Sequence, residues 1–134
     1  MKTLTIFTLV FISITHFAQG QNYDRAISIP VTMNGSALVN PWAGGMDAPE
    51  YSTIDLNGDN IKDLFVFDRR SNRISTFINN GTSGQIDYHY SPQYISSFPE
   101  FVNWVQLVDF NCDGKEDIFT DANSGGIKVY LNVS

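Results

Sequence analysis

Two nine-residue acidic segments carry the residues of this chain that are best suited to chemistry. They start 54 residues apart, at Asp55 and at Asp109, and Asp or Asn occupies positions 1, 3, 5 and 9 of both. Side chains that alternate in this way direct several oxygen atoms at one point, which is the arrangement that a hard cation such as Ca²⁺ requires. Three carboxylates close together in one loop would repel one another, and a bound cation offsets that repulsion. The oxygen-bearing residues are Asp55, Asn57, Asp59, Asp63, Asp109, Asn111, Asp113 and Asp117.

The acidic segments belong to a longer repeat. An apolar run follows each of them, beginning at Leu64 and at Ile118, and a turn then leads to a returning stretch. Apolar and β-branched runs bounded by Gly, Asn and Ser predict antiparallel strands. A unit of about 50 residues with four such strands is typical of a β-propeller blade. We expect strands at 51–54, 64–67, 74–78, 85–90, 104–108, 118–120 and 127–131.

The predicted fold class is therefore all-β, with antiparallel four-stranded blades of a β-propeller and about two blades present. We assign one repeat to residues 41–92 and a second, truncated one to residues 93–134. Residues 21–40 form a lead-in segment, in which we expect one strand at 26–31 and a turn at 33–36. Closed propellers typically have at least four blades. We therefore expect this chain to be a fragment that associates with the remaining blades of a longer chain.

Residues 1–20 have the pattern of a secretory signal peptide. Lys2 gives a basic start, residues 4–17 are mostly apolar, and the small residues Ala18 and Gly20 suit a cleavage site. The apolar run is shorter than the roughly 18 residues of a membrane span, and an uncleaved anchor is the alternative. We expect a secreted or cell-surface protein with no membrane insertion after signal cleavage.

The charge balance is acidic. Cleavage would remove one of eight basic residues and none of the 14 acidic ones, which gives a net charge of 7 − 14 = −7. This balance argues against nucleic acid and anionic lipid as partners. The only basic concentration is Arg69, Arg70 and Arg73, which we interpret as part of a solvated turn. Cys112 is the single cysteine and cannot form an internal disulfide, so stability must come from a core, from metal or from more chain.

The loops, their spacing and the strands that follow them resemble the FG-GAP/VCBS-type repeats of integrin-α-like β-propellers, over about residues 41–132. In that family the acidic loop joins neighbouring strands of a blade and binds Ca²⁺. The resemblance implies that the four oxygen-bearing side chains of each loop are ligands, and that the carbonyl groups of Ile61 and Lys115 complete the two sets. The chain departs from the family pattern at Asn60, where Gly is usual. Asn tolerates a left-handed backbone better than other non-glycine residues.

Three other interpretations of the acidic loops are weaker. An EF-hand needs a bidentate Glu at position 12 and flanking helices, whereas Val66 and Thr120 stand there and the flanks are β-type. Dockerin-type modules have helices after the loops and a much closer spacing. Simple polar β-turns do not need an acid at position 9, which both copies have.

The function that follows is a secreted calcium-binding repeat module with a structural or recognition role toward a protein or a glycan. The alternative is part of a propeller-fold carbohydrate-active enzyme whose site lies in further blades. His89 is the only histidine beyond residue 20, and we interpret it as a strand position. Trp42 and Trp104 either pack in the core or stack on a sugar ring. The sequence has no nucleophile-elbow, zinc-protease or phosphate-binding glycine motif.

Overall fold

The chain folds into antiparallel β-sheets. A computed structural model describes residues 23–134, and the predicted signal peptide lies outside them. The first sheet is a small hairpin of β1 (Thr32–Met33) and β2 (Ser36–Ala37). The described residues contain no α-helix, and none of their segments is a helix long and apolar enough to cross a membrane. The predicted all-β class is therefore confirmed.

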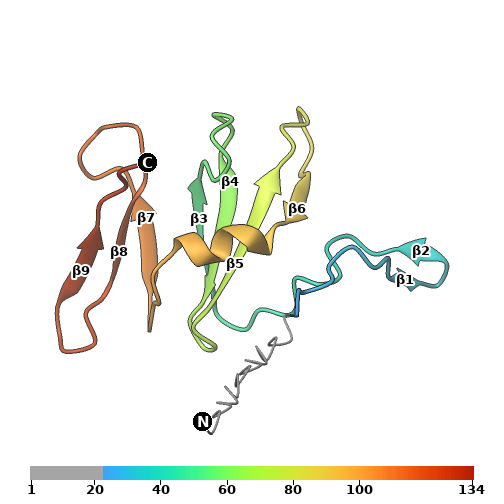
Figure 1. Cartoon of the computed structure of the whole chain (residues 1–134), viewed down its shortest axis with the longest axis horizontal. Coiled ribbons are helices and arrows are strands. Elements are labelled where there is room, and N and C mark those ends of the chain that lie inside the picture. Colours follow the sequence, from blue (N-terminus) through green and yellow to red (C-terminus); the bar gives the residue numbers. More distant parts are fainter. Residues whose placement is uncertain (1–22) are drawn as a thin grey trace, which may run out of the picture.

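Two larger sheets hold the acidic loops. The first, sheet B, has the order β3-β4-β5-β6, and the second, sheet C, has the order β7-β8-β9. Figure 1 shows the two sheets side by side, with both acidic loops at the same end. Residues 23–134 form two blades and no closed propeller. The strands are β3 (Pro49–Ile54), β4 (Asp63–Asp68), β5 (Arg73–Asn79), β6 (Tyr88–Tyr90), β7 (Val105–Val108), β8 (Asp117–Asp121) and β9 (Ile127–Tyr130).

All seven strands expected beyond residue 50 are present, but three details differ from the prediction. Strand β6 begins only at Tyr88, because residues 82–87 form a turn. Residues 26–31 form no strand, and the carbonyl oxygen of Ile29 accepts a hydrogen bond from the Trp42 indole instead. A short 3₁₀ helix, η1 (Pro92–Ser97), connects β6 to β7 and was not expected. The turn predicted at 33–36 is formed, with Asn34 and Gly35 both at positive φ as a tight hairpin requires.

The main core lies between sheets B and C. Ile54, Phe65 and Phe67 of sheet B pack against a buried group that precedes and forms β7, namely Phe101, Val105 and Leu107. The Phe65 and Phe101 rings meet edge to face with centroids 6.3 Å apart. Alternate residues of a strand point to opposite faces, so this core takes only one side of β4.

The other side of β4 packs against the stretch that precedes β3. Ala43 of that stretch is buried with Val66, Phe77 and Tyr90, and Trp42 packs against the same cluster. Strand β4 is therefore buried on both faces, which explains its continuous apolar run. Trp42 is half-buried and packs on sheet B rather than between the two larger sheets.

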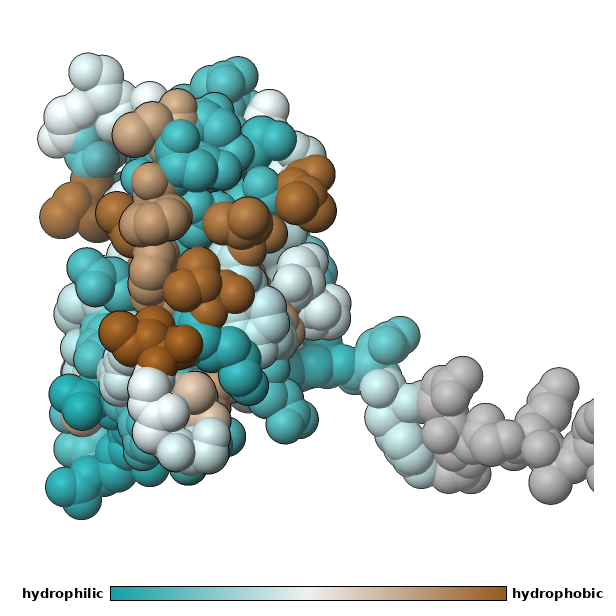
Figure 2. Space-filling model, turned by 90° about the vertical axis from the view of Figure 1, so that its left-hand side faces the viewer, coloured by the Kyte–Doolittle hydropathy of each residue, from teal (hydrophilic) through white to brown (hydrophobic). Residues whose placement is uncertain are grey.

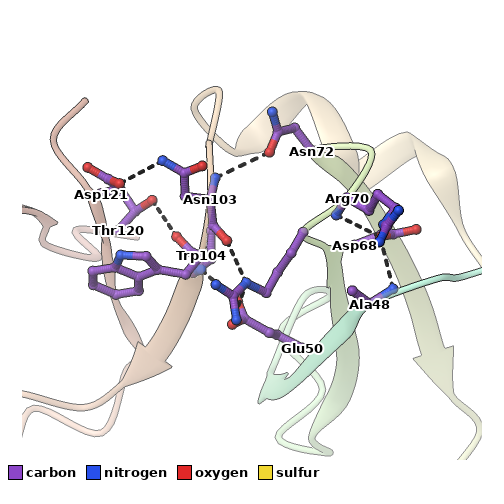
Figure 3. Close-up of polar contacts among 11 residues, drawn as sticks. Ala48, Glu50, Asp68, Arg70, Asn72, Asn103, Trp104, Thr120 and Asp121 are labelled. Carbon is purple, nitrogen blue, oxygen red and sulfur yellow. Dashed lines mark hydrogen bonds and ion pairs between the residues drawn. The ribbon is translucent and has the colours of Figure 1, made fainter.

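Polar contacts join the two sheets at the end opposite the acidic loops (Figure 3). The Glu50 carboxylate accepts a hydrogen bond from the Val105 backbone N–H at 2.9 Å, and its other oxygen lies 3.5 Å from the Arg69 guanidinium. The same guanidinium donates to the Asn103 carbonyl oxygen. Arg69 and Arg70 are exposed in the turn between β4 and β5, as expected, although Arg69 also reaches across to the neighbouring sheet. Arg73 is half-buried and donates to the carbonyl groups of Ala43 and Gly45. Long side chains in a turn can reach neighbouring carbonyl groups while part of the side chain stays in water.

Candidate metal-binding loops

The first acidic loop closes around the carboxylate of Asp55. One oxygen of Asp55 accepts hydrogen bonds from the backbone N–H groups of Gly58 and Asp59, at 2.7 and 3.2 Å. The other oxygen accepts from the N–H of Asn60 at 2.9 Å. The side chain at position 1 therefore gathers the backbone of positions 4 to 6 around itself. Short Asp and Asn side chains favour turns for this reason.

Positions 3 and 5 continue the pattern. The amide oxygen of Asn57 accepts from the Asp59 backbone N–H at 3.0 Å, and a carboxylate oxygen of Asp59 accepts from the Ile61 N–H at 2.7 Å. The remaining Asp59 oxygen accepts from the Asn57 side-chain amide at 2.8 Å. These three side chains are thereby fixed on one short loop, and Asn57 and Asp59 are exposed to solvent.

The second loop repeats these hydrogen bonds at the same positions. Asp109 accepts from the backbone N–H groups of Asp113 and Gly114, at 3.0 and 2.9 Å. Asn111 accepts from the Asp113 N–H at 3.0 Å, and Asp113 accepts from the Lys115 N–H at 2.9 Å. The two loops therefore have a common local structure as well as a common sequence pattern.

Position 9 has a different environment. Asp63 and Asp117 are fully buried, at 0% exposure. The two oxygens of Asp63 accept from the backbone N–H groups of Leu56 and Asn79, both at 2.8 Å. This carboxylate therefore ties the start of the loop to the end of the third strand. Asp117 forms the same pair of bonds in the second repeat, with Phe110 and Asn132 as donors.

Each loop uses two backbone positions with positive φ. At position 6, Asn60 has φ 66°, as its place in the pattern predicted, and Gly114 has φ 88°. At position 4, Gly58 has φ 79° and Cys112 has φ 61°. Each loop therefore places one non-glycine residue in the left-handed region, which costs some stability. Cys112 is exposed and free.

Electrostatics favour the charged form of two candidate ligands. Burial raises the pKa of Asp55, but the backbone N–H groups of residues 57 to 60 donate to its carboxylate and lower the pKa by more. The pKa of Asp55 is therefore below its ordinary 3.8. The Asn111 side chain and the Lys115 backbone N–H, by donating to Asp113, hold the pKa of that carboxyl below its ordinary value. Both groups are therefore ionised at neutral pH, as cation ligands must be.

The donor chemistry of the loops suits a hard cation. Each loop offers carboxylate, amide and backbone carbonyl oxygens and no sulfur or imidazole ligand, apart from Cys112 at the intervening position 4. Among residues 23–134, no group of three or more Asp, Glu, His or Cys side chains has the arrangement of a metal site. The expected cluster of three carboxylates is thus absent from both loops, because the carboxylate at position 9 turns toward the third strand. A carboxylate oxygen has more than one acceptor site, so Asp63 keeps capacity for a cation beside its hydrogen bonds.

The two loops are in contact with each other. Lys62, at position 8 of the first loop, forms an ion pair with Glu116, at position 8 of the second, with 2.5 Å between nitrogen and oxygen. A cleft between the loops is lined by residues of both, including Asp55, Asn60 and Asp113. This ion pair was not predicted from the sequence. The available signal was the opposite charge of the residues at position 8 of the two loops.

The other candidates lie away from the loops. His89 is an exposed residue of β6, and its imidazole is 3.9 Å from the Asp87 carboxylate. Trp104 is half-buried, and its backbone carbonyl accepts a hydrogen bond from Thr120. Trp42 donates its indole N–H to Ile29. None of these contacts brings His89, Trp104 or Trp42 to an acidic loop.

Together, these features define an all-β repeat protein whose two antiparallel sheets each carry one acidic loop between neighbouring strands. Residues 55–120 match the family model of the FG-GAP-like repeat, a stretch that holds both acidic loops, strands β4 to β7 and all but the last residue of β8. This match covers just under half of the chain and supports an FG-GAP-type repeat module of the integrin-α-like type. No curated protein and no solved structure matches the chain.

Proposed function

We propose that the two acidic loops each bind one Ca²⁺ ion and that the chain is a secreted or cell-surface module with a structural or recognition role. The observation that carries the proposal is the repeated hydrogen-bonding pattern of the two loops. In both, positions 1, 3 and 5 hold their oxygens on one short turn through the same backbone donors. A plain turn needs only one of these side chains.

The proposed ligands are the same in both loops. The side chains at positions 1, 3, 5 and 9 supply oxygens, and the backbone carbonyl at position 7 adds one more. These residues are Asp55, Asn57, Asp59, Ile61 and Asp63 in the first loop and Asp109, Asn111, Asp113, Lys115 and Asp117 in the second. Bound Ca²⁺ would supply a compensating charge for the carboxylates and additional bonds that hold the loop closed.

Binding of the ion is coupled to folding. An unfolded chain has no preformed site, so the binding free energy adds to the free energy of unfolding. At a free ion concentration 100 times Kd, the gain is about 2.7 kcal/mol for each site. The ion thereby supports the ends of two sheets whose loops face the same side of the molecule (Figure 1). A protein or glycan ligand is the proposed partner of the module, because the acidic net charge argues against nucleic acid and anionic lipid.

The test measures stoichiometry and stability together. Isothermal titration of the chain with Ca²⁺ is expected to give two ions per chain, and Asp59→Ala and Asp113→Ala are each expected to give one. The melting temperature is expected to rise with Ca²⁺ and to rise less with Mg²⁺, because Mg²⁺ demands a stricter octahedral geometry.

Asp24→Ala is the matched control. Asp24 is exposed and lies outside both loops, so the variant loses one carboxylate without touching a proposed ligand. It is expected to keep two ions per chain. The ligand assignment is refuted if Asp59→Ala and Asp113→Ala also keep two ions, or if they lose as much stability in chelator as in Ca²⁺.

A further inference from the structure

Three asparagines of the chain are followed directly by glycine, namely Asn34, Asn57 and Asn80. Each such pair can react with itself, because glycine has no Cβ to crowd the approach of its backbone nitrogen to the preceding side chain. The apolar side chains that gather on the outer side of sheet C offer no such chemistry (Figure 2). The three pairs carry the same reacting groups, but the structure places them in different environments.

The reaction is an attack of the glycine backbone nitrogen on the side-chain carbonyl carbon of the asparagine. A new C–N bond closes a succinimide ring, the bond to the side-chain nitrogen breaks, and the backbone amide proton leaves with that nitrogen as ammonia. Water then opens either C–N bond of the ring and gives aspartate or isoaspartate. The only co-reactant is water, and both reacting groups must be free to approach each other.

The first acidic loop holds both reacting groups at Asn57. The Gly58 N–H donates to a carboxylate oxygen of Asp55 at 2.7 Å. The Asn57 side chain is bound at both ends, since its oxygen accepts from the Asp59 backbone N–H and its NH₂ group donates to the Asp59 carboxylate. The nitrogen and the carbon that would react are therefore fixed on separate partners while the loop is closed.

Asn80 is held in a similar way. The Gly81 N–H donates to the side-chain oxygen of Asn79 at 3.0 Å. The Asn80 side chain is hydrogen bonded to Asp87. The Ile61 side chain also crowds Gly81, because a Cβ at this glycine would lie 2.7 Å from it. Attack at Asn80 therefore requires that these hydrogen bonds break first.

Asn34 has none of these contacts. It lies with Gly35 in the turn between β1 and β2, both residues are exposed, and the hairpin projects away from the two larger sheets (Figure 1). Among residues 23–134, no hydrogen bond engages the Gly35 N–H, and beyond its chain neighbours no atom lies within 4 Å of the place of its Cβ. Each strand of the hairpin has only two residues, and small hairpins are marginally stable. The chain at Asn34 therefore reaches a reactive conformation most easily.

We propose that Asn34 is the site at which the folded chain deamidates, and that hydrogen bonds protect Asn57 and Asn80. The product adds a negative charge to the exposed hairpin and leaves Asn57, a proposed ligand of the first loop, unchanged. The inference does not depend on bound Ca²⁺, so it stands or falls separately from the proposed ion binding.

The test follows the three sites in the full chain at mildly alkaline pH in chelator. Digestion and mass spectrometry detect the mass gained when an amide becomes an acid, and Asn34 is expected to convert first. Asn57 should react at least about tenfold more slowly than Asn34, because its glycine N–H is bound to a charged group, and Asn80 about two- to tenfold more slowly, because the acceptor is neutral. In urea, where these hydrogen bonds are lost, the three rates are expected to converge.

Asn79→Ala tests the protective role of the hydrogen bond, because it removes the acceptor of the Gly81 N–H. It is expected to raise the rate at Asn80 in the folded chain and to leave that rate unchanged in urea. Gln85→Ala is the matched control, since it removes an exposed amide side chain near the same turn that does not contact Gly81. The comparison within the parent chain needs no variant. Asn34 reacting no faster than Asn57 and Asn80 in the folded chain, or the same ratio of rates in urea, would overturn the inference.

Discussion

The carboxylate at position 9 is expected to stabilise the fold even without a cation. Asp63 is fully buried and accepts two backbone hydrogen bonds, each 2.8 Å long, from Leu56 and Asn79. Exchange of Asp63 for Asn keeps the size of the side chain but replaces one oxygen by an NH₂ group. One of the two backbone N–H groups then faces a donor and loses its partner, and the other keeps only a neutral acceptor.

The magnitude follows from those two changes. A hydrogen bond to a charged group contributes about 1.5–3 kcal/mol, and a buried donor without a partner costs about 1–3 kcal/mol. Because the two effects overlap at one atom, we expect Asp63→Asn to lower the free energy of unfolding by about 3 kcal/mol in chelator. For a domain near 100 residues this corresponds to a fall of roughly 12 °C or more in the melting temperature.

The assay is urea and thermal unfolding of the full chain in excess chelator. Asp59→Asn is the control, because Asp59 is exposed and its substitution is expected to change stability by about 0.5 kcal/mol or less. Asp117→Asn is expected to behave like Asp63→Asn, since Asp117 accepts the equivalent bonds. If Asp63→Asn has the stability of the parent chain in chelator and loses stability only in Ca²⁺, position 9 acts through the ion alone and the structural role is refuted.

Three further outcomes are expected. Phe65→Ala should destabilise by about 3–5 kcal/mol in urea unfolding, because it opens a cavity in the core. Phe119→Ala, at the equivalent but half-buried position, should cost less, and equal losses would contradict the difference in burial between the two positions. The Asp47 backbone N–H, with other donors, holds the pKa of Asp68 below its ordinary 3.8. The contribution of Asp68 to the free energy of unfolding should therefore be complete above pH 3.8 and be lost as the pH falls through the folded pKa. Asp68→Asn should make the free energy of unfolding less dependent on pH in this range, and an unchanged pH dependence would argue against the role of Asp68. The ion pair of Lys62 and Glu116 is partly exposed, so a double-mutant cycle should give a coupling below about 1 kcal/mol that shrinks with added salt; a coupling independent of salt would exclude a screened surface pair.

The strands were predictable because their signal is local. The apolar run at 64–67 reflects burial on both faces of β4, and the turns around it are rich in Asn and Gly. The segments that were missed or misplaced depend on partners far along the chain. Residues 26–31 look like a strand, but they pack as an irregular segment because the Trp42 indole takes the carbonyl of Ile29. Helix η1 packs against β5 as it carries the chain from β6 to β7, and no local pattern in the sequence indicated it.

In the acidic loops, too, the local contacts were predictable from the sequence and the long-range contacts were not. The turn formed by positions 1, 3 and 5 follows from short side chains that bond to backbone two to five residues further on. The structural role of position 9 was missed because its second donor lies on the third strand, 16 residues beyond Asp63. The aligned residues Asn79 and Asn132 were the available signal, since both occupy the position that donates to the buried carboxylate.

The two acidic loops share some positions and differ at another, and the two kinds of position have different roles. Positions 1, 3, 5 and 9 are the same in both loops, and their hydrogen bonds stay within one repeat. Position 8 changes sign, from Lys62 to Glu116, because that side chain reaches across to the neighbouring loop. The proposed ion binding therefore depends on residues within each repeat, whereas the contact between repeats depends on position 8. Substitutions at position 8 should change the coupling of the sheets at this end and leave the ligand set of each loop intact.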